Sequence, residues 1–183
     1  MMEFKVRRCG PGDERALSAL GRATFLETYA GTAEASDILA YMETEHSVEH
    51  YQRWLAGRFA HIWVVETAIG GSAIGYLVAL DLDDAELSNQ MEIKRIYLLY
   101  RFHHNGIGNL LIDEILATAR EKRVTALILK VHEVNKNAID FYFRHGFRIV
   151  GDEPLRAGER DYKVLIMKLD LGVRPHYEIS ETA

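Results

Sequence analysis

A glycine-punctuated turn at residues 103–109 constrains the fold most strongly, because it joins two segments of different periodicity. Residues 93–99 before it form an apolar, strand-like run, and residues 107–122 after it carry apolar side chains at helical spacing. The first N–H groups of a helix have no partner inside the helix, and glycine lets an anion lie close against the backbone. The junction therefore predicts a strand–turn–helix unit with a candidate phosphate site. A simple tight turn is the alternative.

The length and composition of the chain indicate one globular domain. Its 183 residues are 48% hydrophobic and 27% charged, which is ordinary for a folded protein. We expect the domain over residues 1–171 and a tail over residues 172–183. No apolar run approaches the about 18 residues that span a bilayer, and the N-terminus lacks the apolar core of a signal peptide. We therefore expect a cytoplasmic protein with no membrane partner.

The formal net charge of −5 disfavours nucleic acid as a partner, because binding to a phosphate backbone needs a basic surface. An acidic protein suits a cationic substrate, although mild acidity is also common in proteins without one. The single cysteine, Cys9, excludes an internal disulfide and a cysteine-based zinc site. No pair of histidines shows the H-E-x-x-H pattern of a zincin, and His103 and His104 are adjacent and so diverge on a regular backbone, so we expect no metal site.

Periodicity and turn residues predict the order of strands and helices. Helices are expected at residues 13–29, 37–41, 48–55, 107–122 and 137–144. Strands are expected at residues 4–8, 61–66, 72–80, 91–99, 124–131, 147–150 and 162–169. The run at 124–131 is almost entirely apolar, which suits a central strand that is covered on both faces. Together these elements predict one mixed α/β or α+β domain.

Two blocks of the sequence carry a resemblance to a known family. Residues 91–98 with the glycine turn look like the strand and pyrophosphate loop of the GNAT superfamily of acyl-CoA-dependent N-acetyltransferases. Residues 135–142, followed by His145-Gly146-Phe147, match that family's N-x-x-A-x-x-F-Y…G-F element. The resemblance implies a mixed, strongly twisted central sheet flanked by helices, with acetyl-CoA as cosubstrate. It also implies that the cofactor lies in the cleft between the strand at residues 92–98 and the strand at residues 124–131.

The N-terminal third narrows the resemblance. Residues 24–29 and 37–41, with residues 92–97, are similar to bacterial polyamine N-acetyltransferases of the PaiA type. This likeness implies that the acceptor is a small primary amine, with polyamines as the first candidates. Acetylation of a protein N-terminus or lysine is the enzymatic alternative, and a non-catalytic acyl-CoA-binding or regulatory domain is the alternative from another class. A homodimer is common in the family.

The turn departs from the family pattern Q/R-x-x-G-x-G/A. His103 occupies its first position, and His104 and Asn105 occupy positions that often carry glycine and a basic residue. Gly106 and Gly108 are both in place. Because histidine is only partly charged near neutral pH, the departure weakens the expected side-chain contacts to phosphate and leaves the backbone donors unaffected.

Acetyl transfer to an amine needs a base, because an amine is mostly protonated at neutral pH. Glu92 on the cofactor strand is the candidate, acting directly or through water, and a solvated carboxylate near a strand end is the alternative. An acidic loop could attract a polycation, although a solvated loop is the simpler interpretation. Its carboxylates belong to Asp81, Asp83, Asp84 and Glu86.

The resemblance implies the remaining catalytic roles. A backbone N–H at Leu98, where the family's strand splays at a bulge, would stabilise the oxyanion, and Ile96 and Tyr97 would pair with the pantetheine arm. Tyr142 would be the acid that protonates the leaving thiolate; a tyrosine packed beside its neighbours with a surface hydroxyl is the alternative.

The expected cofactor-binding set combines the strand, the turn and the downstream element. It comprises Ile96, Tyr97, Leu98, His103, His104, Asn105, Gly106, Ile107, Gly108, Asn109, Asn135, Asn137, Ala138, Tyr142 and Arg144. Asn135 could instead be a helix cap, and Arg144 a solvated helix end. His132 and Glu133 are weaker catalytic candidates. Cys9 lies far from these motifs, which favours direct transfer in a ternary complex over an acyl-enzyme route.

Overall fold

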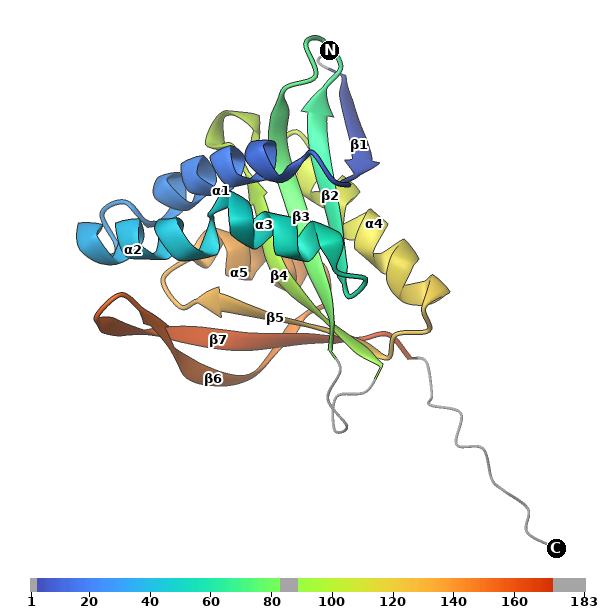
Figure 1. Cartoon of the computed structure of the whole chain (residues 1–183). Helices are drawn as coiled ribbons and strands as arrows, with labels where there is room; N and C mark the ends of the chain where they lie inside the picture. The colour runs from blue at the N-terminus through green and yellow to red at the C-terminus, as the bar shows by residue number, and fades with distance from the viewer. Residues whose placement is uncertain (1–2, 83–88, 173–183) are drawn as a thin grey trace, which may run out of the picture.

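The computed structural model describes residues 3–82 and 89–172. Figure 1 shows its elements along the chain. They are β1 (Phe4–Arg8), α1 (Glu14–Tyr29), α2 (Ala35–Glu45), α3 (Val48–Ala56), β2 (Ala60–Thr67), β3 (Ala73–Leu82), β4 (Gln90–Leu98), the 3-10 turn η1 (Tyr100–Phe102), α4 (Ile107–Glu121), β5 (Ala126–His132), α5 (Lys136–Arg144), β6 (Arg148–Ala157) and β7 (Arg160–Asp170). The predicted order of helices and strands is confirmed.

The strands form one seven-stranded sheet in the order β1-β2-β3-β4-β5-β7-β6. β4 and β5 are parallel, and all the other neighbouring strands are antiparallel. The mixed sheet predicted from the sequence is therefore confirmed. Predicted boundaries were least accurate at residues 147–150, where β6 extends to Ala157. This strand lies at the exposed edge of the sheet, so it has no apolar run to mark its length.

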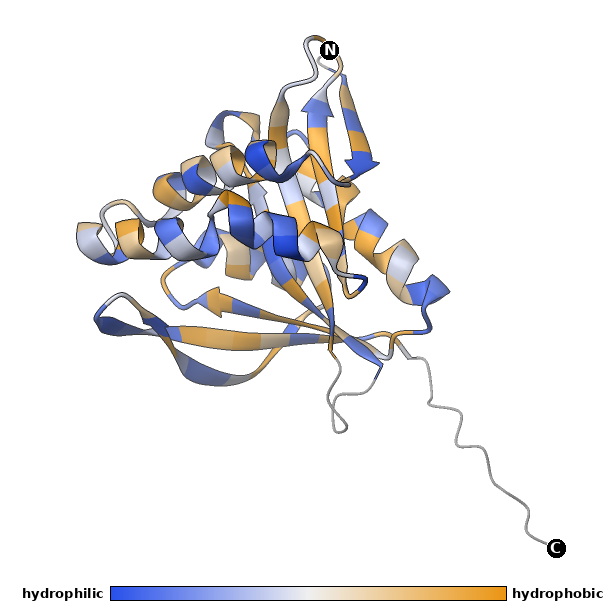
Figure 2. Cartoon of the chain, viewed as in Figure 1, coloured by the Kyte–Doolittle hydropathy of each residue, from blue (hydrophilic) through white to orange (hydrophobic). Residues whose placement is uncertain are grey.

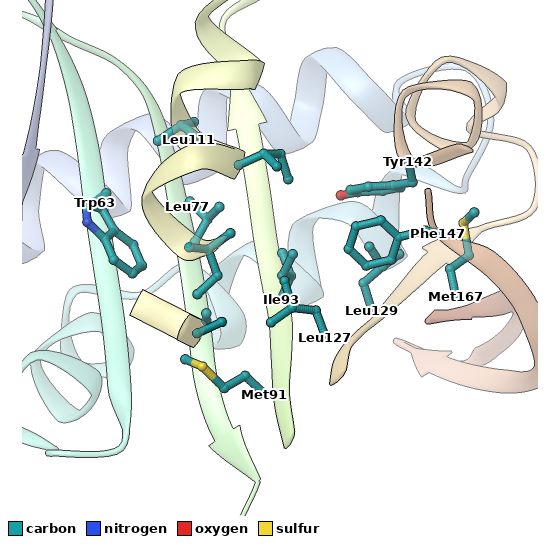
Figure 3. Packing of buried hydrophobic residues seen from close by; sticks show 14 of the residues in the cluster. Trp63, Leu77, Met91, Ile93, Leu111, Leu127, Leu129, Tyr142, Phe147 and Met167 are labelled. Atoms are coloured by element: carbon teal, nitrogen blue, oxygen red, sulfur yellow. The ribbon is translucent and has the colours of Figure 1, made fainter. Parts of the chain in front are cut away.

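Helices cover both faces of the sheet. Figure 1 shows α1, α2 and α3 in front of it and α4 and α5 behind it. Behind the sheet, Leu77 on β3, Ile93 on β4 and Leu127 on β5 pack with Leu111 of α4 in the main core (Figure 3). Each of these side chains is at most 2% exposed, and burying one contributes about 1.5–3 kcal/mol. In Figure 2 the inner strand β5 is largely hydrophobic, whereas the edge strand β6 carries several hydrophilic stretches.

A bulge in β4 decides which of its side chains face the front of the sheet. Val78 of β3 pairs with Arg95 and its neighbour Ala79 pairs with Ile93, so Lys94 has no cross-strand partner there. Such an extra residue reverses the alternation of side chains beyond it. Glu92 and Tyr97 consequently face the same side, although they are five positions apart. The expectation of a bulge at Leu98 is wrong, because Leu98 pairs regularly with Gly75.

The parallel pair β4–β5 is short. Its register runs from Gln90 with Ala126 to Ile93 with Leu129, although both strands continue for several residues beyond. Figure 1 shows the two strands diverging toward the carboxyl end of β4. The sheet therefore has a gap between the second halves of β4 and β5, and this gap positions the candidate site.

Candidate active site

A pocket of about 110 Å³ lies in front of this gap. α1 and α2 cover it, β4 and β5 form its floor, and β6 and β7 form its outer wall. Its lining residues are Phe25, Tyr29, Ala33, Asp37, Ile38, Tyr41, Glu92, Lys94, Tyr97, Lys130, His132, Leu155, Ala157, Tyr162 and Val164. We call this the acceptor pocket. Several of its walls are aromatic faces, which suit an alkylammonium group because they attract cations.

Glu92 lines the acceptor pocket from β4, as the base assignment requires. Its carboxylate is only 13% exposed and lies 3.3 Å from the ammonium of Lys94, the bulged residue. The alternative of a solvated carboxylate does not describe this environment. The role of Glu92 as the base stays a prediction.

Tyrosine side chains from both faces of the sheet meet near the gap. Tyr29 of α1 is close to Tyr97 and to Asn135, which lower the pKa of its hydroxyl, whereas burial raises it more strongly. Burial raises the pKa of Tyr142 on α5, and electrostatic repulsion from the Tyr29 hydroxyl raises it further. Tyr29 lines the acceptor pocket, and Tyr142 belongs to the core behind the sheet.

The side chain of Tyr142 is 6% exposed, so its hydroxyl does not lie on the surface as the alternative required. Figure 3 shows the ring beside Phe147, with the hydroxyl directed toward the β4 side. Burial raises the pKa of Tyr142, because the charged phenolate would be poorly solvated. The group remains protonated at neutral pH and can donate a hydrogen bond to a developing thiolate.

The open edge of β4 presents the backbone of Ile96 and Leu98. Leu99 N–H donates to the carbonyl of Ile74 at 2.9 Å, and hydrogen bonds alternate along an antiparallel pair. Tyr97 therefore also directs its backbone groups at β3, while those of Ile96 and Leu98 point toward the gap. The expectation that the Tyr97 backbone pairs with a pantetheine arm is wrong, and Tyr97 contributes its ring to the acceptor pocket instead.

The glycine turn ends at the N-terminus of α4. Gly106 has φ +75° and open space where a Cβ would stand, so it allows close approach to the backbone. The N–H groups of Ile107 and Gly108 precede the first helical bond, which Asn109 makes to the Gly106 carbonyl at 3.0 Å. Such free donors at a helix N-terminus can bind an anion, and their contact with the diphosphate of an acyl-CoA stays a prediction.

Two side chains of the glycine turn, those of His103 and Asn105, form hydrogen bonds with nearby backbone carbonyls. His103 Nε2 lies 2.9 Å from the Leu98 carbonyl oxygen, and the Asn105 amide donates to the carbonyls of Phe102 and His103 at 3.2 and 3.0 Å. His104 is exposed with φ +61°. The turn therefore offers a phosphate its backbone more than its side chains.

Gly108 serves a packing role that the sequence interpretation did not include. A Cβ at this position would lie 3.0 Å from the ring of Phe141 on α5. The glycine thus lets α4 and α5 approach closely behind the gap. Ile107 is 1% exposed and belongs to the core, so it offers its backbone alone.

The element at residues 135–144 forms α5. The Asn135 side chain accepts a hydrogen bond from Ala138 N–H at 3.2 Å, so it caps the helix, which was the alternative interpretation. Its amide also lies near Tyr29. Asn137 and Arg144 are exposed on the helix, Ala138 is half-buried, and their cofactor roles stay predictions.

Several candidate residues lie outside this arrangement. Asp81 accepts from His61 at 3.1 Å and from Lys122 at 3.0 Å, so its charge is already balanced. Asp83, Asp84 and Glu86 lie outside the described residues, as does the tail after Gly172. Burial raises the pKa of Cys9 to about 12, which leaves the thiol protonated and agrees with direct transfer.

Neither a metal site nor a membrane span is found in residues 3–82 and 89–172. Those residues contain no group of three or more histidine, cysteine, aspartate or glutamate side chains that could hold a metal ion. None of the described helices is long and apolar enough to cross a membrane.

Comparison with known proteins decides the family. The family model described as the acetyltransferase (GNAT) family matches residues 27–147. These residues include β4, the glycine turn and α5. The chain belongs to the GNAT family. An uncharacterized N-acetyltransferase of Lactobacillus delbrueckii subsp. lactis is 31% identical over 152 residues, covering 80% of this chain and 85% of that protein.

Two further likenesses come from Thermoplasma acidophilum. A spermidine N(1)-acetyltransferase is 23% identical over 148 residues, which cover 81% of this chain and 90% of that protein. The crystal structure of a PaiA N-acetyltransferase in complex with coenzyme A aligns with a TM-score of 0.73 at 20% identity, covering 92% of this chain and 99% of that one. This structural likeness confirms the GNAT fold.

As a GNAT N-acetyltransferase, the protein uses acetyl-CoA as its acetyl donor. The gap between β4 and β5, the free N–H groups of α4 and the outward backbone of Ile96 and Leu98 are an arrangement that fits this cosubstrate.

Sequence reasoning missed most of the acceptor pocket. Asp37, Tyr41 and Tyr162 line it, yet none of them was a candidate site residue. The sequence offered no signal for them, because the burial of Asp37, which is 3% exposed in the first turn of α2, appears only in the folded protein. His132 lines the pocket as well. Burial lowers its pKa, and its Nδ1 accepts from Val134 N–H at 3.3 Å, so the neutral ring carries its proton on Nε2.

Proposed function

We propose that this GNAT enzyme transfers the acetyl group of acetyl-CoA to a primary amine that enters the acceptor pocket. The observation that carries this proposal is the position of Glu92. Its carboxylate faces an aromatic-lined pocket directly in front of the gap where β4 presents Leu98. An ammonium group held there would lie between a base and the expected site of the thioester.

Three groups of the protein, Glu92, the Leu98 N–H and Tyr142, have separate roles in the proposed acetyl transfer. Acetyl-CoA supplies the acetyl thioester. Glu92 accepts one proton of the ammonium group, directly or through water, and the neutral nitrogen attacks the carbonyl carbon. The Leu98 N–H donates to the carbonyl oxygen as charge develops on it. The C–N bond forms and the C–S bond breaks. Tyr142 donates a hydrogen bond to the sulfur, which gains the second proton lost by nitrogen.

A polyamine is the first candidate for the acceptor. The similar Thermoplasma acidophilum protein is named a spermidine N(1)-acetyltransferase, and the aromatic walls of the pocket suit an alkylammonium chain. A groove extends the pocket between α2 and the β6–β7 hairpin and shares Tyr41, Lys94, Leu155 and Ala157 with it. An elongated acceptor could occupy both. A lysine side chain or a peptide N-terminus fits the same shape and is the second candidate.

An acceptor panel tests the proposal. Purified protein is incubated with acetyl-CoA and spermidine, a linear alkylamine, or a peptide with a free N-terminus and a lysine, and release of CoA thiol is followed. Release with spermidine supports the polyamine assignment, and release with the peptide alone supports the protein-directed one. Tight binding of acetyl-CoA without turnover on any amine would contradict both and favour a non-catalytic acyl-CoA-binding domain.

A further inference from the structure

We propose that Asp37 determines acceptor specificity by clamping the turn between β6 and β7 onto α2. The clamp sets the width of the pocket, which admits a slender, unbranched alkylamine and excludes branched or aromatic amines. The inference rests on the proposed function, because it concerns the same acceptor. It concerns the shape of the acceptor rather than the acetyl transfer itself.

The carboxylate of Asp37 is engaged by three donors from the far end of the chain. It accepts from the Tyr162 hydroxyl at 2.8 Å, from Arg160 Nη1 at 3.1 Å and from Glu159 N–H at 3.3 Å. The Tyr162 hydroxyl also accepts from Glu34 N–H at 3.4 Å. These contacts join the first turn of α2 to the β6–β7 turn across more than 120 positions of sequence. We call this set of contacts the Asp37 clamp.

A glycine makes the close approach possible. Gly158 has φ +59°, and a Cβ built there would lie 2.3 Å from Asp37 Oδ1 and 3.1 Å from the Asp37 Cα. Any side chain at this position would therefore push α2 and the turn apart. The clamp depends on Asp37 in α2 and on Gly158 in the β6–β7 turn, so a substitution at either residue should open it.

The Asp37 clamp borders both the acceptor pocket and the groove that extends the pocket between α2 and the β6–β7 hairpin. Asp37 and Tyr162 line the pocket, whereas Gly158 lines the groove, and Ala157 lines both. The pocket of about 110 Å³ is partly open to solvent and is small beside the about 300–1,000 Å³ of typical ligand sites. It suits an alkyl chain without branches, and Tyr162 and Tyr41 supply aromatic walls on the outer side.

The charge of Asp37 keeps the clamp closed. The carboxylate is 3% exposed, and leaving a buried charge without its partners is strongly unfavourable. Hydrogen bonds from a tyrosine hydroxyl and a guanidinium to a carboxylate are stronger than neutral ones. The donors lower the pKa of Asp37, so the interaction persists at neutral pH. Replacing the carboxylate removes all three contacts at once.

The test compares acetylation of n-butylamine with that of isobutylamine and benzylamine. The wild type should acetylate n-butylamine with the highest kcat/KM. In Asp37→Ala and Gly158→Ala the ratio of kcat/KM for the branched or aromatic amine to that for n-butylamine should rise about tenfold, the scale of discrimination by a hydrophobic pocket. KM for acetyl-CoA should stay within about twofold, because the clamp lies on the acceptor side.

Asp161→Asn is the matched control. Asp161 is on the same hairpin and is exposed, and it pairs with Arg156 at 3.5 Å instead of joining the clamp. Its substitution should leave the ratio unchanged. If Asp37→Ala fails to fold, Tyr162→Phe removes the 2.8 Å hydrogen bond and keeps the ring, and it should shift the ratio in the same direction.

The outcomes separate the two proposals. A wild type that acetylates neither these amines nor the spermidine and peptide of the acceptor panel overturns the proposed function and the clamp with it. A wild type that acetylates spermidine or the peptide but none of the three amines overturns the clamp alone. A wild type that acetylates linear and branched amines equally well overturns the clamp alone. Folded Asp37→Ala and Gly158→Ala variants with the wild-type ratio would also overturn the clamp and leave the acetyl transfer intact.

Discussion

The imidazole of His103 is tied to the carbonyl of Leu98. Nε2 of the ring lies 2.9 Å from the oxygen, so Nε2 carries the proton and donates it to the last residue of β4. His103 opens the glycine turn, and Leu98 is the proposed oxyanion donor. The contact therefore fixes the end of the catalytic strand relative to the loop that would hold the diphosphate.

Replacing His103 should separate this positioning role from a phosphate contact. We expect His103→Ala to raise KM for acetyl-CoA about tenfold, the worth of one hydrogen bond, whereas His103→Gln should restore it because its amide can also donate to Leu98. Steady-state kinetics with varied acetyl-CoA measures the effect. Equal KM values for the alanine and glutamine variants would contradict the assignment.

Tyr142→Phe should lower kcat before it changes cofactor affinity. The substitution keeps the buried ring packed against Phe147 and removes only the hydroxyl. We expect kcat to fall about 100-fold, the lower end of the usual contribution of a general acid, with KM for acetyl-CoA nearly unchanged. An unchanged kcat in the folded variant would reject Tyr142 as the donor to the leaving sulfur.

Glu92→Gln should reduce the rate with protonated amines. The amide keeps the shape of the side chain and cannot accept a proton, so kcat/KM for the amine should fall about 100-fold. Raising the pH, which deprotonates the amine in solution, should recover part of the loss. Glu121→Gln, at the exposed end of α4, is the control and should behave like the wild type. Loss of the same size in both variants would exclude Glu92 as the base.

Gly108→Ala should destabilise the fold through Phe141. The new Cβ would lie 3.0 Å from the ring, and overpacking of this kind costs about 1–3 kcal/mol. Alanine is the better helix former by about 1 kcal/mol, so the net loss should be near the lower end. Urea unfolding measures it. Phe141→Leu in the Gly108→Ala background should recover stability, and a failure to do so would show that packing is not the cause.

Stability should fall in mild acid because of His46. Burial lowers its pKa to about 2 in the folded protein, against 6.5 for a free histidine. Below pH 6.5 the unfolded chain therefore binds a proton that the folded protein does not. The free energy of unfolding should drop by up to about 1.4 kcal/mol per pH unit for this residue.

Urea unfolding at pH 7.0, 6.0 and 5.0 measures this slope. Burial lowers the pKa of His50, His61 and His132 in the same direction, so they add to the wild-type slope. His46→Asn should be less stable at pH 7 and show a shallower pH dependence. An identical slope in the variant would mean that His46 is not responsible.

Much of the fold could be predicted because its signals are local. Three features can each be recognised from a window of about 15 residues or fewer: the apolar run of β5, the helical stripe of α4 and the glycine turn between β4 and α4. The boundaries of β6 could not be predicted, because an exposed edge strand lacks the apolar alternation that marks its neighbours. The bulge at Lys94 was equally hidden, since it is defined by the register with β3.

The candidate site was predicted in part. Glu92, Leu98, Gly106 and Tyr142 lie around one gap, as the two sequence blocks suggested. The acceptor side was not foreseen, because its residues come from six different helices and strands. Asp37 and Tyr162 have no shared sequence pattern, and they meet only because the β6–β7 hairpin folds back over α2.

The sequence by itself determined the order of elements, the glycine turn and the family, because these depend on periodicity and on residues close together in the chain. Only the tertiary structure decided that Glu92 and Tyr97 face the same pocket, since that depends on one unpaired residue in β4. It also decided the Asp37 clamp. A buried carboxylate must find its donors wherever the fold brings them, and here they lie more than 120 positions away.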